Sequence, residues 1–101
     1  MSVNLTARTR TVIAHFFLPS RASAIEQLLA DECANNLPLY RPATPEGLER
    51  IRFAVLKISS GNEDKLLEVI SSAKRDWRDV LVRAGFANDL EAHNKWLEGL
   101  Q

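Results

Sequence analysis

The sequence predicts an all-α protein, folded as a single-domain bundle of four to five helices. Apolar residues recur at spacings of three and four along most of the chain, and helix-starting residues precede several of these runs. Single glycines and prolines separate the runs. Hydrophobic residues make up 46% and charged residues 26% of the 101 residues, which is ordinary for a folded globular domain.

The N-terminal segment predicts a short amphipathic helix over residues 10–17, preceded by a frayed end over residues 1–9 and stopped by Pro19. The β-branched residues of this helix leave a strand open as an alternative. The stretch RTRTVIAHFFLPSRASA also resembles a secretory signal, but its apolar run is short and contains His15. We therefore expect a helix whose apolar face consists of Val12, Ile13, Phe16 and Phe17.

A second helix is expected to begin at a capping box formed by Ser23 and Glu26, and to end at residues 35–36. In such a box the hydroxyl accepts from a backbone N–H of the first turn, and the carboxylate accepts from the capping residue. The connection LPLYRPAT, residues 37–44, is expected to be extended. Its two prolines disfavour helix for themselves and for the residues before them.

A third helix is predicted from Thr44 and Pro45, which supply an N-cap and a first-turn proline, to about Ser60. Gly61 is expected to end it. Because its apolar stripe is wide, we expect it to be the central helix. The stripe comprises Leu48, Ile51, Val55 and Ile58, widened by Phe53, Ala54 and Leu56.

Two more helices are predicted toward the C-terminus. Asn62 is expected to cap a helix over residues 63–84, with a bend near residues 71–72, and Gly85 followed by Phe86 predicts a Schellman ending. Asn88 is expected to cap a last helix from residue 89 to about residue 100. The inner face of this last helix is expected to hold Leu90, Trp96, Leu97 and Leu100, with His93 on or near it.

The stretch DWRD, residues 76–79, raises the question of whether its tryptophan serves a chemical site or anchors a helix. On a helical wheel of about 100° per residue, Trp77 falls within the apolar stripe, and Asp76 and Arg78 fall on its two borders. We interpret Trp77 as a buried anchor, flanked by two charges that set the rotation of the helix. The predicted core comprises Trp77, Phe53, Leu56, Ile70 and Leu81.

The segments RPATPEGLERIRFAVLKIS and AKRDWRDVLVRAGFA resemble small bacterial helical proteins of unassigned function that carry a DWRD-like helix. The resemblance covers residues 41–87. It implies a bacterial origin and no mechanism.

Thirteen basic and thirteen acidic residues cancel, so the net charge does not favour nucleic acid or an anionic membrane as the partner. Residues 1–25 nevertheless carry Arg8, Arg10 and Arg21 without any acid. With the helix-turn-helix-like rhythm of VLVRAGFANDLEAHNKWL, this makes a nucleic-acid-associated protein the alternative function. Acids in the last helix would repel phosphates, so we expect no nucleic-acid partner. No apolar run approaches the roughly 20 residues of a membrane-spanning helix.

The sequence predicts no catalytic, cofactor-binding or metal-binding residue. Cys33 is the only cysteine, which excludes an internal disulfide and fits a cytoplasmic location. The four glycines are scattered, so no phosphate-binding loop is present. His93 is expected to be a half-buried structural histidine. An enzyme would need a pocket that joins His93 or Cys33 to acids of other helices.

The expected function is therefore a small non-enzymatic protein-interaction or regulatory module, whose partner is another protein or a second copy of this chain. Apolar and basic side chains in terminal segments and loops cover either the core or a partner. The candidate interaction surface comprises Arg8, Arg10, Phe16, Phe17, Tyr40 and Trp96.

Overall fold

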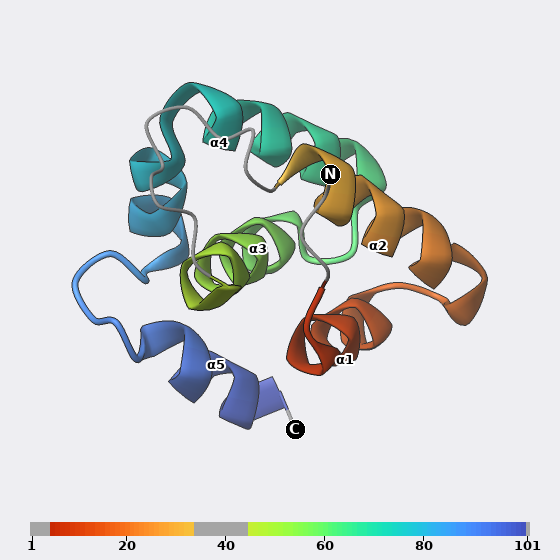
Figure 1. The fold of residues 1–101 in the computed structure, drawn as a ribbon, viewed down its shortest axis with the longest axis horizontal. Helices are drawn as coiled ribbons and strands as arrows, with labels where there is room; N and C mark the ends of the chain where they lie inside the picture. The colour runs from red at the N-terminus through yellow and green to blue at the C-terminus, as the bar shows by residue number, and fades with distance from the viewer. Residues whose placement is uncertain (1–4, 34–44, 101) are drawn as a thin grey trace.

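Five α-helices make up the fold in a computed structural model that describes residues 5–33 and 45–100. They are α1 (Ala7–Phe16), α2 (Pro19–Glu32), α3 (Pro45–Ser59), α4 (Glu63–Ala84) and α5 (Ala92–Leu100). Within the described ranges no residue lies in a strand. The all-α helical bundle predicted from the sequence is confirmed. Helix α3 lies at the centre, and the other four helices surround it (Figure 1).

Helix α3 is central because its middle is buried on every side. All side chains of residues 51–56 are at most 1% exposed, a run that covers more than one full helical turn. A helix with no exposed face belongs in the interior. The predicted core residues Phe53, Leu56, Ile70 and Leu81 are buried as expected. Helix α4 makes the most extensive contact with α3.

Helix α1 begins earlier than the sequence predicted. Thr6 is its N-cap, and the Thr6 hydroxyl accepts a hydrogen bond of 3.1 Å from the backbone N–H of Thr9. Leu5 and Thr9 are both buried. The expectation of a frayed end over residues 1–9 is therefore wrong for residues 5–9. Thr6 was itself a signal for the start of a helix, because threonine is a preferred N-cap residue. The prediction relied on the apolar pattern and missed it.

Helix α2 begins at Pro19 rather than at the capping box predicted at Ser23. Pro19 occupies the first turn, where its missing N–H costs nothing and its fixed φ suits the helix. Ser23 consequently lies inside the helix, and the predicted box does not form at its start. The helix ends at Glu32 with Cys33 as C-cap. The predicted end at residues 35–36, the extended connection over residues 37–44 and the Thr44 cap lie outside the described residues.

Helix α4 has the predicted bounds, with Asn62 as its N-cap, but it breaks at Asp76 and not near residues 71–72. Asp76 has extended backbone angles, and its carboxylate accepts a 3.1 Å hydrogen bond from the N–H of Arg78. That is the geometry of an N-cap, so Asp76 starts a second short helix inside α4. The Ser72 hydroxyl donates to the Glu68 carbonyl at 3.2 Å, and the helix keeps regular backbone angles there.

The DWRD stretch is thus a helix start as well as a packing element. Trp77 is half-buried against the core, and the Arg78 guanidinium lies 5.3 Å from the centroid of its ring. The break places Asp76 in a local turn rather than against a neighbouring helix. The wheel prediction therefore holds for the burial of Ile70 and Leu81, whereas Trp77, predicted as a buried anchor, is only partly buried. It fails for Asp76, because a wheel assumes an unbroken helix.

The end of α4 follows the predicted Schellman motif. Gly85 has φ 80° and ψ 20°, and the N–H of Phe86 donates to the Leu81 carbonyl at 2.9 Å. Two cations of α3 also bind the carbonyl end of α4. Lys57 Nζ donates to the Ala84 carbonyl at 2.6 Å, and Arg50 donates to the Phe86 carbonyl. Cations at this end are favoured by the exposed carbonyls and the helix dipole.

Helix α5 begins at Ala92, three residues later than predicted, and Asn88 does not cap it. The Asp89 carboxylate instead accepts from the N–H of Glu91 at 2.8 Å, which forms a turn before the helix. Leu90 was predicted on the inner face but is 73% exposed, because it lies in this turn. Leu97 and His93 are buried, and Leu100 packs partly against the core. None of the described helices is both long and apolar enough to span a membrane.

Two glycines with positive φ predict an order of stability effects. In Gly61→Ala the new Cβ would lie 2.8 Å from the Phe16 carbonyl oxygen, in addition to the strain at φ +89°. Gly85→Ala meets only Lys57 Nζ at 3.8 Å. We expect the free energy of unfolding to fall by more than about 2 kcal/mol in Gly61→Ala and by about 1 kcal/mol in Gly85→Ala.

Gly99 lies in open space within α5, so Gly99→Ala should raise the free energy of unfolding by up to about 1 kcal/mol. Urea denaturation checks this order, and equal losses at residues 61 and 85 would contradict it.

The break in α4 predicts a difference between two neighbouring aspartates. Asp76→Ala removes the cap of the second half-helix and should cost about 1 kcal/mol of unfolding free energy. Asp79→Ala removes an equally exposed carboxylate that caps nothing and should change stability by less than about 0.5 kcal/mol. Chemical denaturation of both variants checks this prediction. A smaller loss for Asp76→Ala than for Asp79→Ala would show that the carboxylate does not support the break.

Candidate functional site

An aromatic cluster joins α1, α3 and α5 and includes several candidate interaction residues. The Trp96 ring stacks on Phe16, with centroids 6.1 Å apart. It lies edge-on to Phe53 at 5.9 Å and tilted against Phe86 at 5.8 Å. Offset and edge-on pairs of this kind stabilise packing beyond the area they bury. Phe17 is buried at the end of α1. In the structure these side chains contact the core and one another.

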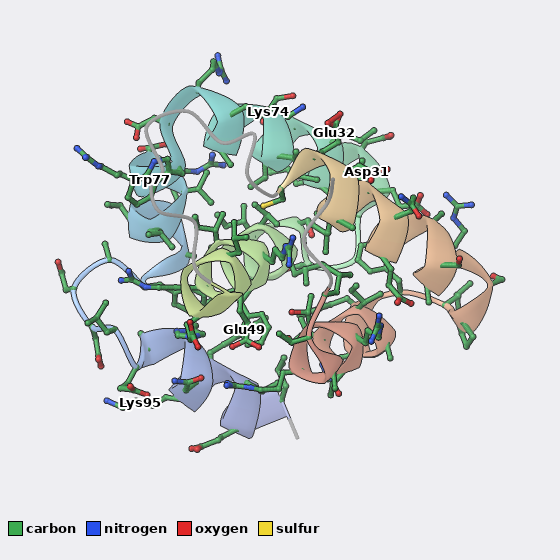
Figure 2. All side chains as sticks on the ribbon, viewed as in Figure 1. Asp31, Glu32, Glu49, Lys74, Trp77 and Lys95 are labelled. Carbon is green, nitrogen blue, oxygen red and sulfur yellow. The ribbon has the colours of Figure 1, made fainter. Side chains whose placement is uncertain are left out.

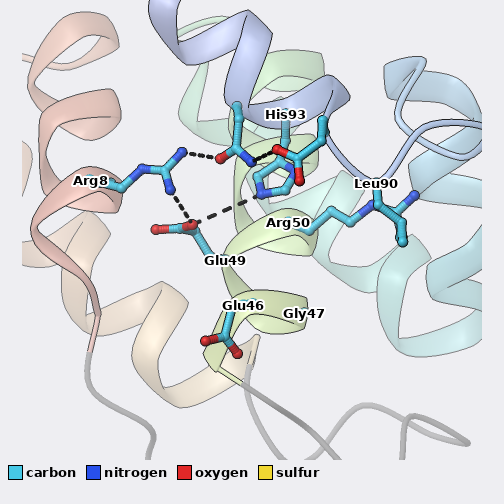
Figure 3. A pocket seen from close by; sticks show the side chains of 9 residues that line it. Arg8, Glu46, Gly47, Glu49, Arg50, Leu90 and His93 are labelled. Carbon is cyan, nitrogen blue, oxygen red and sulfur yellow. Dashed lines mark hydrogen bonds and ion pairs between the residues drawn. The ribbon is translucent and has the colours of Figure 1, made fainter.

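A pocket of about 420 Å³ opens beside this cluster, between the first turns of α1, α3 and α5 (Figure 3). It brings together side chains that are far apart in the sequence. Two arginines, three glutamates and a histidine line it, together with one exposed leucine. The lining residues are Arg8, Glu46, Gly47, Glu49, Arg50, Leu90, Glu91, His93 and Asn94.

Glu49 is the centre of this pocket. It extends from α3 into the space between α1 and α5 (Figure 2), yet its side chain is only 8% exposed. One carboxylate oxygen accepts from the Thr6 hydroxyl at 2.7 Å, and the other lies 3.3 Å from the Arg8 guanidinium. The same oxygen lies 3.9 Å from His93 Nε2. Burying a charge is costly unless it is paired, and here Thr6 and Arg8 at the start of α1 supply the partners.

A second pocket of about 480 Å³ adjoins the first, and the two share Arg8, Glu91 and Asn94. Arg8 donates to the Asn94 amide oxygen, and the Asn94 amide nitrogen donates to Glu91 at 2.6 Å. This chain of contacts crosses between the two pockets. Leu97 and Glu98 complete the second pocket. We call the two pockets together the α1–α5 groove.

Two residues that line the first pocket each have a buried polar atom without a partner. In the part of the chain that the structure describes, the buried side-chain atoms without a hydrogen-bond partner are Arg50 Nε and His93 Nδ1. The other end of Arg50 is occupied, because it donates to the Phe86 and Ala87 carbonyls. Native proteins rarely leave buried polar groups unpaired, and each exception calls for an explanation, such as a missing partner.

Burial determines the charge of His93. The side chain packs edge-on against Phe53 and beside Phe86, and burial lowers the pKa of the imidazole from its ordinary value of 6.5. The Glu49 carboxylate opposes this shift, while the charges of Arg8 and Arg50 add to it. His93 is therefore neutral at pH 7. The carboxylate beside Nε2 favours the tautomer protonated there, which leaves Nδ1 as an acceptor.

The other sequence candidates have different surroundings. Arg10 pairs with Glu26 at 2.8 Å, and Arg21 forms a two-point contact with Glu63 at 2.7 and 2.9 Å. Tyr40 lies outside the described residues. Burial raises the pKa of the Cys33 thiol to about 12, so the thiol is protonated and unreactive. Among the described residues, no three His, Cys, Asp or Glu side chains form a metal-binding group.

Sequence reasoning missed Glu49, Arg50 and Asn94. Glu49 and Arg52 follow apolar residues of the central helix, where a charge must meet a partner from another element. The position of these charges among apolar residues was the signal from which the sequence could have predicted buried, partnered side chains. Arg52 is 1% exposed and donates to the Cys33 carbonyl at 2.9 Å, which joins α3 to the end of α2. Beside this contact, Lys74 of α4 binds Glu32 at 2.9 Å (Figure 2).

Comparison of the chain with family models, with curated proteins and with solved structures finds no match. The resemblance of residues 41–87 to small bacterial proteins stays a prediction. The functional argument therefore depends on the groove itself.

The buried His93 predicts a pH dependence of stability. Its pKa is lower in the folded than in the unfolded protein, so the unfolded chain binds more protons below about pH 6.5. The stabilisation is complete above pH 6.5 and decreases as the pH falls through the folded-state pKa. We expect His93→Gln to flatten the fall in unfolding free energy between pH 7 and 5. His15→Gln, at an exposed position of α1, is the control and should keep the wild-type slope. Identical slopes for wild type and His93→Gln would contradict this prediction.

Proposed function

We propose that this protein is a small non-enzymatic interaction module, and that the α1–α5 groove binds a segment of a partner protein. The observation that carries this proposal is Leu90, which is 73% exposed at the rim of the groove. Concave surfaces that combine an apolar side chain with convergent polar groups are the usual form of binding sites. The segment that carries Leu90 is exposed from residue 87 to residue 91, so a partner reaches it freely.

The chemistry of the groove supports binding rather than catalysis. The pocket does join His93 to acids of another helix, which is the arrangement an enzyme would need. Both oxygens of Glu49 are nevertheless occupied by Thr6 and Arg8, so this carboxylate is not a free base. At 3.9 Å, Glu49 is too far from His93 Nε2 for the hydrogen bond that orients a catalytic histidine. Among the described residues that line the first pocket, none is a serine, cysteine, threonine or lysine that could act as a nucleophile.

The arginines that suggested nucleic acid support a protein partner instead. Arg8, Arg10 and Arg21 each pair with a carboxylate, on Glu49, Glu26 and Glu63 respectively. Phosphate binding requires cations that are free to replace counterions, and it would have to disrupt these pairs. The single free cysteine supports a cytoplasmic location as part of the same proposal. A bacterial origin also belongs to this proposal and is supported by the resemblance of residues 41–87.

Site-specific photocrosslinking tests the interaction. A benzophenone amino acid placed at Leu90 in the cell should give a discrete crosslinked product with one protein. The matched control is Leu67, a leucine of α4 that is 51% exposed and is not among the residues lining the groove. We expect no product from position 67. No product at position 90, or the same products from both positions, would contradict the proposal. A product of twice the monomer mass would identify a second copy of this chain as the partner.

A further inference from the structure

The positive and negative charges of the α1–α5 groove differ in how well they are partnered within the protein. Its two arginines are bound within the protein, Arg8 to Glu49 and Asn94, and Arg50 to two backbone carbonyls. Glu46 and Glu98 are exposed and form no ion pair with another described residue, and Glu91 bonds the neutral Asn94 amide. Glu91 and Glu98 share the field of one cation, Lys95, which already pairs with Asp89 at 3.0 Å. The described lining carries four glutamates against two arginines, so its net charge is negative. Because acidic surfaces attract cationic groups, this favours a basic partner.

The unpartnered atoms of the pocket provide independent evidence for what would enter it. His93 is 6% exposed, and its neutral ring leaves Nδ1 as an acceptor without a donor. Arg50 Nε is a donor without an acceptor in the same pocket. A peptide backbone offers both complements, because its carbonyl accepts and its N–H donates. A lone metal ion or a simple anion satisfies only one of the two atoms.

We propose that the partner segment in the α1–α5 groove is an extended peptide that carries lysine or arginine side chains. This inference depends on the proposed function. The peptide's main chain bonds His93 and Arg50, its basic side chains lie beside Glu46, Glu91 and Glu98, and an apolar part of the segment covers Leu90. The long stems of lysine and arginine suit this arrangement, since they pack on apolar surface while their charges reach carboxylates.

Fluorescence anisotropy with labelled hexapeptides tests the partner's chemistry on the full chain. Three peptides share two leucines and two glycines and differ in two further residues, which are lysine, glutamate or serine. The lysine peptide should bind most tightly, and its affinity should fall with added salt. In the double variant Glu46→Gln, Glu91→Gln, the affinity should fall about tenfold. Asp79→Asn removes one exposed carboxylate of α4 and should leave the affinity unchanged.

A second variant tests the bond to the histidine. His93→Phe keeps a ring between Phe53 and Phe86 but removes the acceptor, and should weaken binding of the lysine peptide about fivefold. If His93→Phe is unstable because residue 93 is buried, the double variant at the exposed Glu46 and Glu91 still tests whether the groove prefers a basic peptide. Equal or tighter binding of the glutamate or serine peptide would overturn the inference. Binding that Asp79→Asn weakens as much as the double variant does would overturn it as well.

Mass spectrometry of the product crosslinked at position 90 separates this inference from the proposed function. A crosslinked partner segment that contains lysine or arginine supports both. A segment without basic residues leaves the interaction module standing and overturns the basic-peptide inference. If nothing crosslinks in the cell, the proposed function fails, whatever the affinity of the lysine peptide.

Discussion

Two charges on the buried central helix constrain how the other helices pack. Glu49 and Arg52 lie on α3 among side chains that are excluded from solvent, and an isolated buried charge costs several kcal/mol, so each needs a partner. Glu49 is paired by Arg8 and Thr6 at the start of α1, and Arg52 by the carbonyl at the end of α2. Any rotation of α3 would leave one of these charges unpaired. The pairs therefore select one arrangement from the many that would bury a similar apolar area.

The groove follows from this arrangement. The aromatic cluster around Trp96 attaches α5 to α1 and α3, while Glu49 of α3 contacts Thr6 and Arg8 at the start of α1. The charged lining of the groove begins where the aromatic cluster ends, at His93 beside Phe53 and Phe86. The two unpartnered atoms of Arg50 and His93 lie at this boundary between apolar and polar packing. Binding at the groove would thus act on the same residues that position α5.

Prediction from sequence succeeded where one residue determined the local backbone. Gly85 has the left-handed conformation that ends α4, and Asn62 caps its start, because few other residues serve these positions well. It failed where several candidates competed within one turn. Pro19 rather than Ser23 starts α2, and Asp76 rather than the paired serines breaks α4. Asp89 forms a turn where Asn88 was expected to cap α5. Tertiary packing determines which of these candidates starts or breaks the helix, because their helix and capping propensities differ by less than the free energy of burying a side chain.

The sequence by itself determined the helical class, the central position of α3 and most of the core, since these depend on the periodicity of apolar residues along one chain. Only the tertiary structure decided the site. Arg8, Glu49, Leu90 and His93 lie up to 85 residues apart in a chain of 101 residues, and no spacing in the sequence relates them. Their proximity depends on the rotation and docking of three helices. Those are set by the polar contacts of buried charges and by ring contacts between distant residues, which a linear pattern does not encode.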